Sequence, residues 1–175
     1  MEQNGMKALT LYWSAGGYTK ELADAVRDFL VRLGVNSEMQ EIGLDLDVDC
    51  SAYSVVIMAS PVYGFLPPLP VKDFLNGLAG ADSSEEDSQS GTQRQYCAVF
   101  CTPGCSETED SELTAGLSYM SGKLKRAGMR VEGQWPVRDH QEGSVMEEGS
   151  DSRLSVDVRE TLARIVDALK EELRV

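Results

Sequence analysis

The chain has 175 residues, of which 42% are hydrophobic, and this composition predicts one globular domain spanning residues 1–175. Its formal net charge of -13 excludes most nucleic-acid and anionic-lipid binding and favours a partner that presents basic residues. The four cysteines include no C-x-x-C pair, so we expect free thiols rather than a disulfide framework.

No part of the sequence has the pattern of a targeting or membrane segment. The first 13 residues lack the basic start and the long apolar region of a signal peptide. No apolar run approaches the roughly 20 residues that a membrane-spanning helix needs. We therefore expect a cytoplasmic protein that does not bind membranes.

Strand-like and helix-like patterns alternate about five times along the chain. Short apolar runs, typical of strands buried on both faces, precede longer segments with apolar residues at helical spacing. This alternation predicts an α/β fold: a doubly wound, five-stranded parallel sheet with helices on both faces. The predicted strands are residues 8–13, 35–42, 53–59, 96–101 and 129–137, and the predicted helices carry residues 19–33, 71–78, 113–124 and 158–173.

Two polar stretches interrupt this alternation. Residues 80–95 are rich in Ser, Glu, Asp and Gln, and residues 141–153 are rich in Gly, Ser and Glu. Such composition cannot bury enough apolar surface to order itself, so we expect mobile loops. Each stretch lies between elements of the same sheet, which favours insertions over domain linkers.

Three turns of unusual composition follow the carboxyl ends of predicted strands. In an open parallel sheet such turns meet at one edge, and ligands bind there. We expect the three turns together, and no single one, to mark a functional site. The candidate residues are Ser14, Ala15, Gly16, Gly17, Tyr18 and Thr19 in the first turn, Ser60, Pro61, Val62, Tyr63 and Gly64 in the second, and Thr102, Pro103, Gly104 and Cys105 in the third.

The first turn has features of a phosphate-binding loop. Gly16 and Gly17 let the backbone approach a ligand, and Ser14 and Thr19 supply hydroxyls. A helix that starts there directs free N–H groups and a partial positive charge at the turn, so no Lys or Arg is required. The plainer alternative is a strand-to-helix turn in which Thr19 or Ser14 only caps the helix. The Walker and dinucleotide glycine motifs are both absent.

Over most of its length the chain resembles the flavodoxin-like family. The first turn is similar to the S-x-T-G-N-T loop with which that family holds the phosphate of FMN. Ser14, Gly17 and Thr19 match this pattern, whereas Gly16 and Tyr18 stand where the family has Thr and Asn. The resemblance implies that this turn holds a phosphate, with one hydroxyl donor fewer than is usual.

The second turn is the stronger match, because S-P-x-Y-G at 60–64 precedes a proline and then V-x-x-F-L. The resemblance implies that Tyr63 stacks on the isoalloxazine ring and that Gly64 lets the backbone meet the flavin edge. A half-buried loop aromatic is the alternative for Tyr63. The third turn lies where the family completes the ring site, but Ser106 and Glu109 have the spacing of a capping box, which favours a plain helix start equally.

Other candidate groups have simpler interpretations. The acidic repeat at 45–49 lacks the glycine and the glutamate of a calcium loop. His140 is the only histidine, so we expect a surface residue and no metal site. Cys97 and Cys101 are expected to pack as small apolar residues. Cys105 lies in the third turn, where a thiol beside a flavin could be redox-active, although loop packing is the preferred interpretation.

These patterns lead to one hypothesis and two alternatives. The hypothesis is an FMN-binding redox protein that carries electrons between protein partners, one of which has a basic docking surface. The first alternative is a flavin-dependent reductase of quinones or other small molecules. The second is a flavin-free interaction module that has the same fold, for which Gly16 and Tyr18 are the best support.

Overall fold

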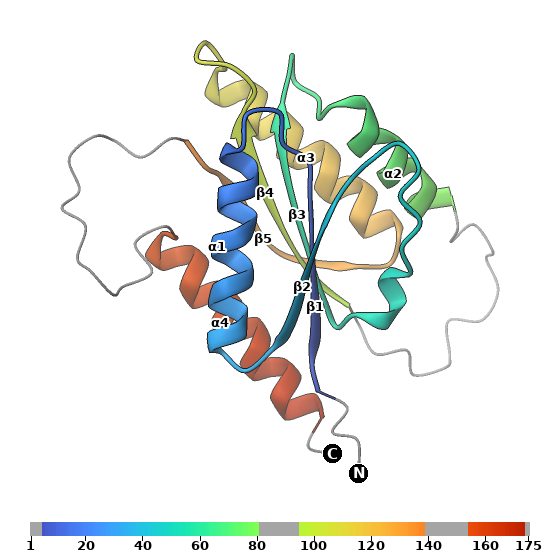
Figure 1. Cartoon of the computed structure of the whole chain (residues 1–175), viewed down its shortest axis with the longest axis vertical. Helices are drawn as coiled ribbons and strands as arrows, with labels where there is room; N and C mark the ends of the chain where they lie inside the picture. Colours follow the sequence, from blue (N-terminus) through green and yellow to red (C-terminus); the bar gives the residue numbers. More distant parts are fainter. Residues whose placement is uncertain (1–4, 81–94, 139–153, 174–175) are drawn as a thin grey trace.

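The structure of the chain, a computed structural model, describes residues 5–80, 95–138 and 154–173. In these residues five strands form one parallel sheet with the order β2-β1-β3-β4-β5. The strands are β1 (Lys7–Tyr12), β2 (Asn36–Glu41), β3 (Val55–Val62), β4 (Tyr96–Pro103) and β5 (Arg130–Pro136), and the helices are α1 (Tyr18–Arg32), α2 (Leu69–Gly80), α3 (Asp110–Arg126) and α4 (Val156–Glu172). Helices α1 and α4 cover one face of the sheet and α2 and α3 the other (Figure 1), which confirms the predicted doubly wound fold.

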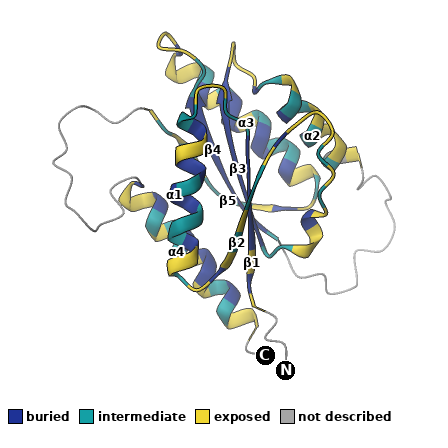
Figure 2. Cartoon of the chain, in the orientation of Figure 1, coloured by how far each residue is buried: buried dark blue, intermediate teal, exposed yellow. Residues whose placement is uncertain are grey.

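The central strands are buried because helices cover both faces of the sheet (Figure 2). Successive side chains of a strand point to opposite faces. Val55 and Ile57 of β3 pack with α1 and α4, whereas Val56 and Met58 pack with α2 and α3. Burying one such side chain stabilises the fold by about 1.5–3 kcal/mol, so apolar burial holds the sheet from both sides.

Helix α1 lies between two glycines. Gly17 precedes the helix with a φ of 95°, and Gly34 follows it with a φ of 84°, in the left-handed region that glycine adopts without steric cost. At the helix end, the N–H of Gly34 donates to the carbonyl of Val31 and the N–H of Val35 donates to the carbonyl of Leu30, both at 3.0 Å. This is a Schellman motif, and it confirms the predicted helix end at Gly34.

The two central strands extend beyond their predicted ends. β3 continues through residues 60–62 and β4 continues to Pro103, so the predicted ends at residues 59 and 101 are wrong. β1 pairs with β3 only as far as Ala59. Beyond that residue no strand of the described residues pairs with this side of β3, and a proline, which lacks an N–H donor, is tolerated at such an edge.

Helix α3 begins directly after Glu109, and its capping box differs from the predicted one. The N–H of Glu109 donates to the carboxylate Oε2 of Glu112 at 2.8 Å. The predicted box of Ser106 and Glu109 is wrong because a separate turn intervenes. In that turn the N–H of Thr108 donates to the carbonyl of Cys105 at 3.3 Å, which delays the helix by three residues relative to the prediction.

The two predicted mobile loops fall almost entirely outside the described residues. Of the stretch 80–95, only Gly80, the last residue of α2, and Gln95, just before β4, are described. The stretch 141–153 and His140 lie outside the described residues altogether. Among the residues that are described, no helix combines the length and the apolar character needed to cross a membrane.

Helix α3 lies close to the sheet at Gly116. A β-carbon added to Gly116 would collide with the γ-carbons of Val62 and lie 3.1 Å from the Sγ of Cys101. Both neighbours are fully buried, and Val62 is β-branched and stiff. Gly116→Ala should therefore lower the free energy of unfolding by about 1–3 kcal/mol, although alanine favours helices.

Gly122→Ala is the matched control, since it lies in the same helix and an added β-carbon meets nothing within 4 Å. It should raise the free energy of unfolding by up to about 1 kcal/mol through helix propensity alone. Urea unfolding measures both variants, and effects of the same sign would contradict the close approach at Gly116.

Candidate functional site

The turns that follow β1, β3 and β4 lie together at the carboxyl edge of the sheet (Figure 1). The hydroxyls of Thr19 and Thr102 share a hydrogen bond of 2.8 Å although the residues are 83 positions apart. The rings of Trp13 and Tyr63 meet edge to face with their centroids 6.3 Å apart. A β-carbon added to Gly104 would lie 2.5 Å from a ring carbon of Tyr63. These contacts thus hold the three turns close to one another.

The first turn presents its backbone to open space. Gly17 is the N-cap residue of α1, and no side-chain hydrogen bond caps the helix. The Ser14 hydroxyl accepts the N–H of Gly17 at 3.0 Å, which shapes the turn and leaves the hydroxyl proton available for donation. Ala15 and Gly16 are exposed, and a β-carbon added to either glycine would meet no atom within 4 Å. The positive end of α1 therefore faces a space in which an anion fits.

Thr19 is more deeply placed than a ligand-binding hydroxyl at the surface would be. Its side chain is 3% exposed, and its hydroxyl is bonded to that of Thr102, which is also fully buried. The bond runs from the start of α1 to the end of β4. Thr19 thus braces two turns from beneath, whereas Ser14 and Tyr18 of the same motif are only half-buried.

The second turn is a tight hairpin. Tyr63 and Leu66 exchange backbone hydrogen bonds of 2.8 and 3.3 Å, and the two residues between them have positive φ angles, 54° at Gly64 and 73° at Phe65. Two successive positive φ values define a type I′ turn, which glycine adopts freely and phenylalanine only under strain. The turn presents Tyr63, 43% exposed, and Phe65, 51% exposed, at the rim of the site.

Four of the predicted site residues are buried within the strands. Ser60, Pro61 and Val62 belong to β3, and Thr102 belongs to β4. The buried Ser60 hydroxyl donates its proton to the carbonyl of Pro61 at 2.9 Å, so this proton is not available to a ligand. These side chains support the turns from below, which leaves Tyr63 as the exposed aromatic residue of the second motif.

A cavity of about 480 Å³ opens between the start of α1 and the turn that follows β4. Its volume falls within the range of about 300–1,000 Å³ that is typical of small-molecule sites. A phenol, a thiol, a hydroxyl and a guanidinium contribute to its wall. The lining residues are Tyr18, Pro103, Cys105, Ser106 and Arg138.

The sequence patterns did not indicate two of these lining residues, Ser106 and Arg138. Arg138 directly follows the predicted strand at 129–137, so the rule that places ligands beyond the carboxyl ends of parallel strands is the signal that points to it. Its guanidinium donates to the carboxylate Oδ1 of Asp110 from Nη2 at 2.7 Å and from Nε at 3.0 Å. Nη2 also donates to the carbonyl of Thr108 at 2.9 Å.

Of the four cysteines, Cys105 is exposed and the other three are buried. Burial raises the pKa of the Cys101 thiol to about 12 and that of Cys50 to about 11. It raises the pKa of Cys97, which is fully buried, still further. These thiols stay protonated and pack as apolar side chains, as predicted for Cys97 and Cys101. The N–H of Cys105 donates to the Oγ1 of Thr108 at 3.2 Å.

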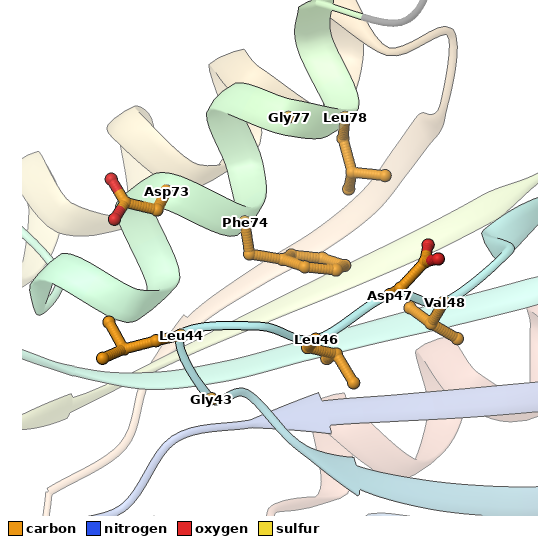
Figure 3. A pocket seen from close by; sticks show the side chains of 9 residues that line it. All are labelled: Gly43, Leu44, Leu46, Asp47, Val48, Asp73, Phe74, Gly77 and Leu78. Carbon is orange, nitrogen blue, oxygen red and sulfur yellow. The ribbon is translucent and has the colours of Figure 1, made fainter.

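A second cavity, of about 370 Å³, lies between helix α2 and the connection that follows β2 (Figure 3). Phe74 and Leu78 point from α2 toward this connection. Asp47 and Asp73 add carboxylates, and none of the described lining residues is basic. Because carboxylates repel a phosphate, the cavity that contains Arg138 is the better candidate for an anionic ligand.

The sequence matches no protein-family model and no curated protein. Solved structures do match it over nearly its whole length. The flavodoxin of Streptococcus pneumoniae TIGR4 is 20% identical, with a TM-score of 0.64 over 95% of this chain and 99% of that one. Flavodoxin 2 from Bacillus cereus is 19% identical, with a TM-score of 0.64 over 95% and 99%. RosB with bound 8-demethyl-8-formylriboflavin-5′-phosphate is 14% identical, with a TM-score of 0.65 over 95% and 81%.

These similarities define a flavodoxin-like fold. The strand order β2-β1-β3-β4-β5 agrees with them, since this order characterises one of the two common doubly wound sheets. In such a sheet the ligand lies at the carboxyl edge, where the order of the strands reverses between β1 and β3. The predicted resemblance is thus confirmed at the level of the fold.

The hydrogen bond between Thr19 and Thr102 can be tested by a double-mutant cycle. Thr19→Val and Thr102→Val should each lower the free energy of unfolding by about 1–2 kcal/mol, because each leaves the other hydroxyl buried without its partner. The double variant should lose less than the sum of the two single losses. Chemical denaturation measures all three variants, and strictly additive losses would show that the two hydroxyls do not bond to each other.

Proposed function

We propose that the chain binds FMN at the carboxyl edge of its sheet and carries electrons between protein partners. The main support is that an uncapped helix start, an exposed tyrosine and a cavity with a guanidinium meet at one edge of a flavodoxin-like sheet. Together they suit a flat aromatic ligand that carries a phosphate. The similarity to a structure that holds a riboflavin 5′-phosphate derivative agrees with this proposal.

The first turn would hold the phosphate. Ser14 would donate its hydroxyl proton, and Gly16 and Gly17 would keep the space before α1 free of side chains. Thr19, which the family resemblance implies as a phosphate ligand, would act by bracing the turn against Thr102. The partial positive charge at the start of α1 would favour the anion.

The second and third turns would hold the ring. The ring of Tyr63 lies nearly perpendicular to that of Trp13 and close to Gly104, and the residue keeps 43% of its surface exposed, which would be available for stacking. Gly64 would let the backbone approach the ring edge, and Pro103 would form the wall on the cavity side. Bound FMN supplies the electron chemistry, while these residues orient the ring and keep water from its covered face.

The net charge of -13 bears on both the reduction potential and the partner. A carboxylate a few ångströms from the ring disfavours an anionic reduced flavin by about 1 kcal/mol in a water-like dielectric, roughly 40 mV for one electron. We therefore propose a low reduction potential. The same charge favours a partner with a basic docking surface, bound through a small and salt-sensitive contact.

Binding is tested by titrating FMN into the purified chain and following the quenching of flavin fluorescence. Tyr63→Ala should raise the Kd by about 3–10-fold, because aromatic stacking contributes about 0.5–1.5 kcal/mol. Tyr63→Phe is the control, since it keeps the aromatic face and should bind nearly as the wild type does. A folded chain that never quenches FMN would favour the flavin-free module, and an unchanged Kd in Tyr63→Ala would remove the role given to Tyr63.

The net charge of -13 predicts that bound FMN has a midpoint potential below that of free FMN. Raising the ionic strength should bring the two values closer, because salt screens exposed carboxylates. Spectroelectrochemical titration at low and high salt measures this difference, and a potential well above that of free FMN would contradict the effect assigned to the carboxylates. Rapid reduction of a quinone by NADH or NADPH, faster than free FMN allows, would favour the reductase over the carrier.

A further inference from the structure

We propose that Arg138 binds the phosphate of the ligand and makes the site selective for phosphorylated over unphosphorylated flavin. The residue lies beyond the three turns that the sequence patterns singled out. This inference rests on the proposed function of the carboxyl edge as an FMN site.

The first turn has few side-chain donors for a phosphate. Gly16 has no hydroxyl, and the hydroxyl of Thr19 is buried against that of Thr102. Near the surface the turn offers the hydroxyl of Ser14 and the phenol of Tyr18, both of them neutral donors. Lys20 is the nearest cation in the sequence, but its ammonium pairs with Asp24 at 3.1 Å on the exposed side of α1. A phosphate dianion at this edge would therefore find its cationic donor on another element.

Arg138 is that donor, because its side chain and Tyr18, the first residue of α1, line the same cavity. It is the one basic residue among the described lining residues. Its hydrogen bonds to described residues use Nε and Nη2, so Nη1 has no partner among them. The planar fork of a guanidinium matches two phosphate oxygens at once, which a backbone N–H cannot do.

The ion pair between Arg138 and Asp110 does not prevent this role. The two side chains are 45% and 92% exposed, and such pairs contribute little to stability. Asp110 lies in the first turn of α3, where the helix dipole favours a carboxylate even without a cation. A phosphate dianion is also a stronger acceptor than a single carboxylate. The guanidinium can thus turn toward the ligand while the first turn of α3 stays helical.

The alternative is a purely structural role, in which Arg138 connects the end of β5 to the start of α3 through its hydrogen bonds to Thr108 and Asp110. In that case its loss would disturb the site as a whole. Comparing the affinities for FMN and riboflavin distinguishes phosphate binding from a structural role, because the two flavins share the ring and the ribityl chain and differ only in the phosphate.

The experiment measures the Kd of FMN and of riboflavin for the wild type and three variants. Arg138→Gln should raise the Kd of FMN about tenfold, the size expected for one lost charge-assisted hydrogen bond, and change the Kd of riboflavin less than about twofold. Arg138→Lys keeps the charge but not the fork, so its FMN Kd should be intermediate. Arg126→Gln, exposed at the opposite end of α3, is the charge-matched control and should change neither Kd.

Each outcome distinguishes phosphate binding by Arg138 from a structural role. An equal loss of both flavins in Arg138→Gln, or no loss of FMN in either Arg138 variant, overturns the assignment and leaves FMN binding intact. A wild type that is folded by circular dichroism yet binds neither flavin overturns the proposed function, and the assignment with it. Should Arg138→Gln melt at a much lower temperature than the wild type, the Arg138→Lys ratio of FMN to riboflavin affinity decides the question.

Discussion

The parallel pairing of β3 with β4 is the constraint on which the candidate site depends. The register runs from Val55 opposite Tyr96 to Val62 opposite Pro103, so the two strands end side by side. The turns that leave them are therefore adjacent from their first residues, and the ring of Tyr63 reaches Gly104. Hydrogen bonds in the buried interior of the sheet, and not the turns themselves, set the shape of this edge.

The proposed function requires an acidic protein to bind an anion at this edge. The net charge is -13, and salt largely screens the interaction of exposed charges separated by more than about 10 Å. Within the proposed site, short-range groups would decide whether an anion binds: the uncapped start of α1, the Ser14 hydroxyl and the guanidinium of Arg138. Local donors at hydrogen-bond distance outweigh distant carboxylates in water. The long-range field remains available for steering a basic partner.

Much of the fold could be predicted because its causes are local. Continuous apolar runs mark strands covered on both faces, and Gly34 marks a helix end that needs a left-handed residue. The errors at residues 60–62 and at Ser106 have different causes. At residues 60–62, pairing with β4 overrides the tendency of proline to end a strand. At Ser106, a local turn between Cys105 and Thr108 precedes the start of α3. Pro61 is tolerated in β3 because β1 pairs with β3 only as far as Ala59, so no N–H of Pro61 is needed on that side of the strand.

The sequence by itself determined the α/β alternation, the five strands, the three turns and the resemblance that indicates a flavin. Periodicity and glycine positions encode these features within short stretches of chain. Only the tertiary structure decided that Thr19 faces inward to Thr102, that Tyr63 lies against Gly104 and that Arg138 lines the same cavity as Tyr18. Each is a contact between residues far apart in the chain, and the distance between such residues depends on how the sheet orders its strands.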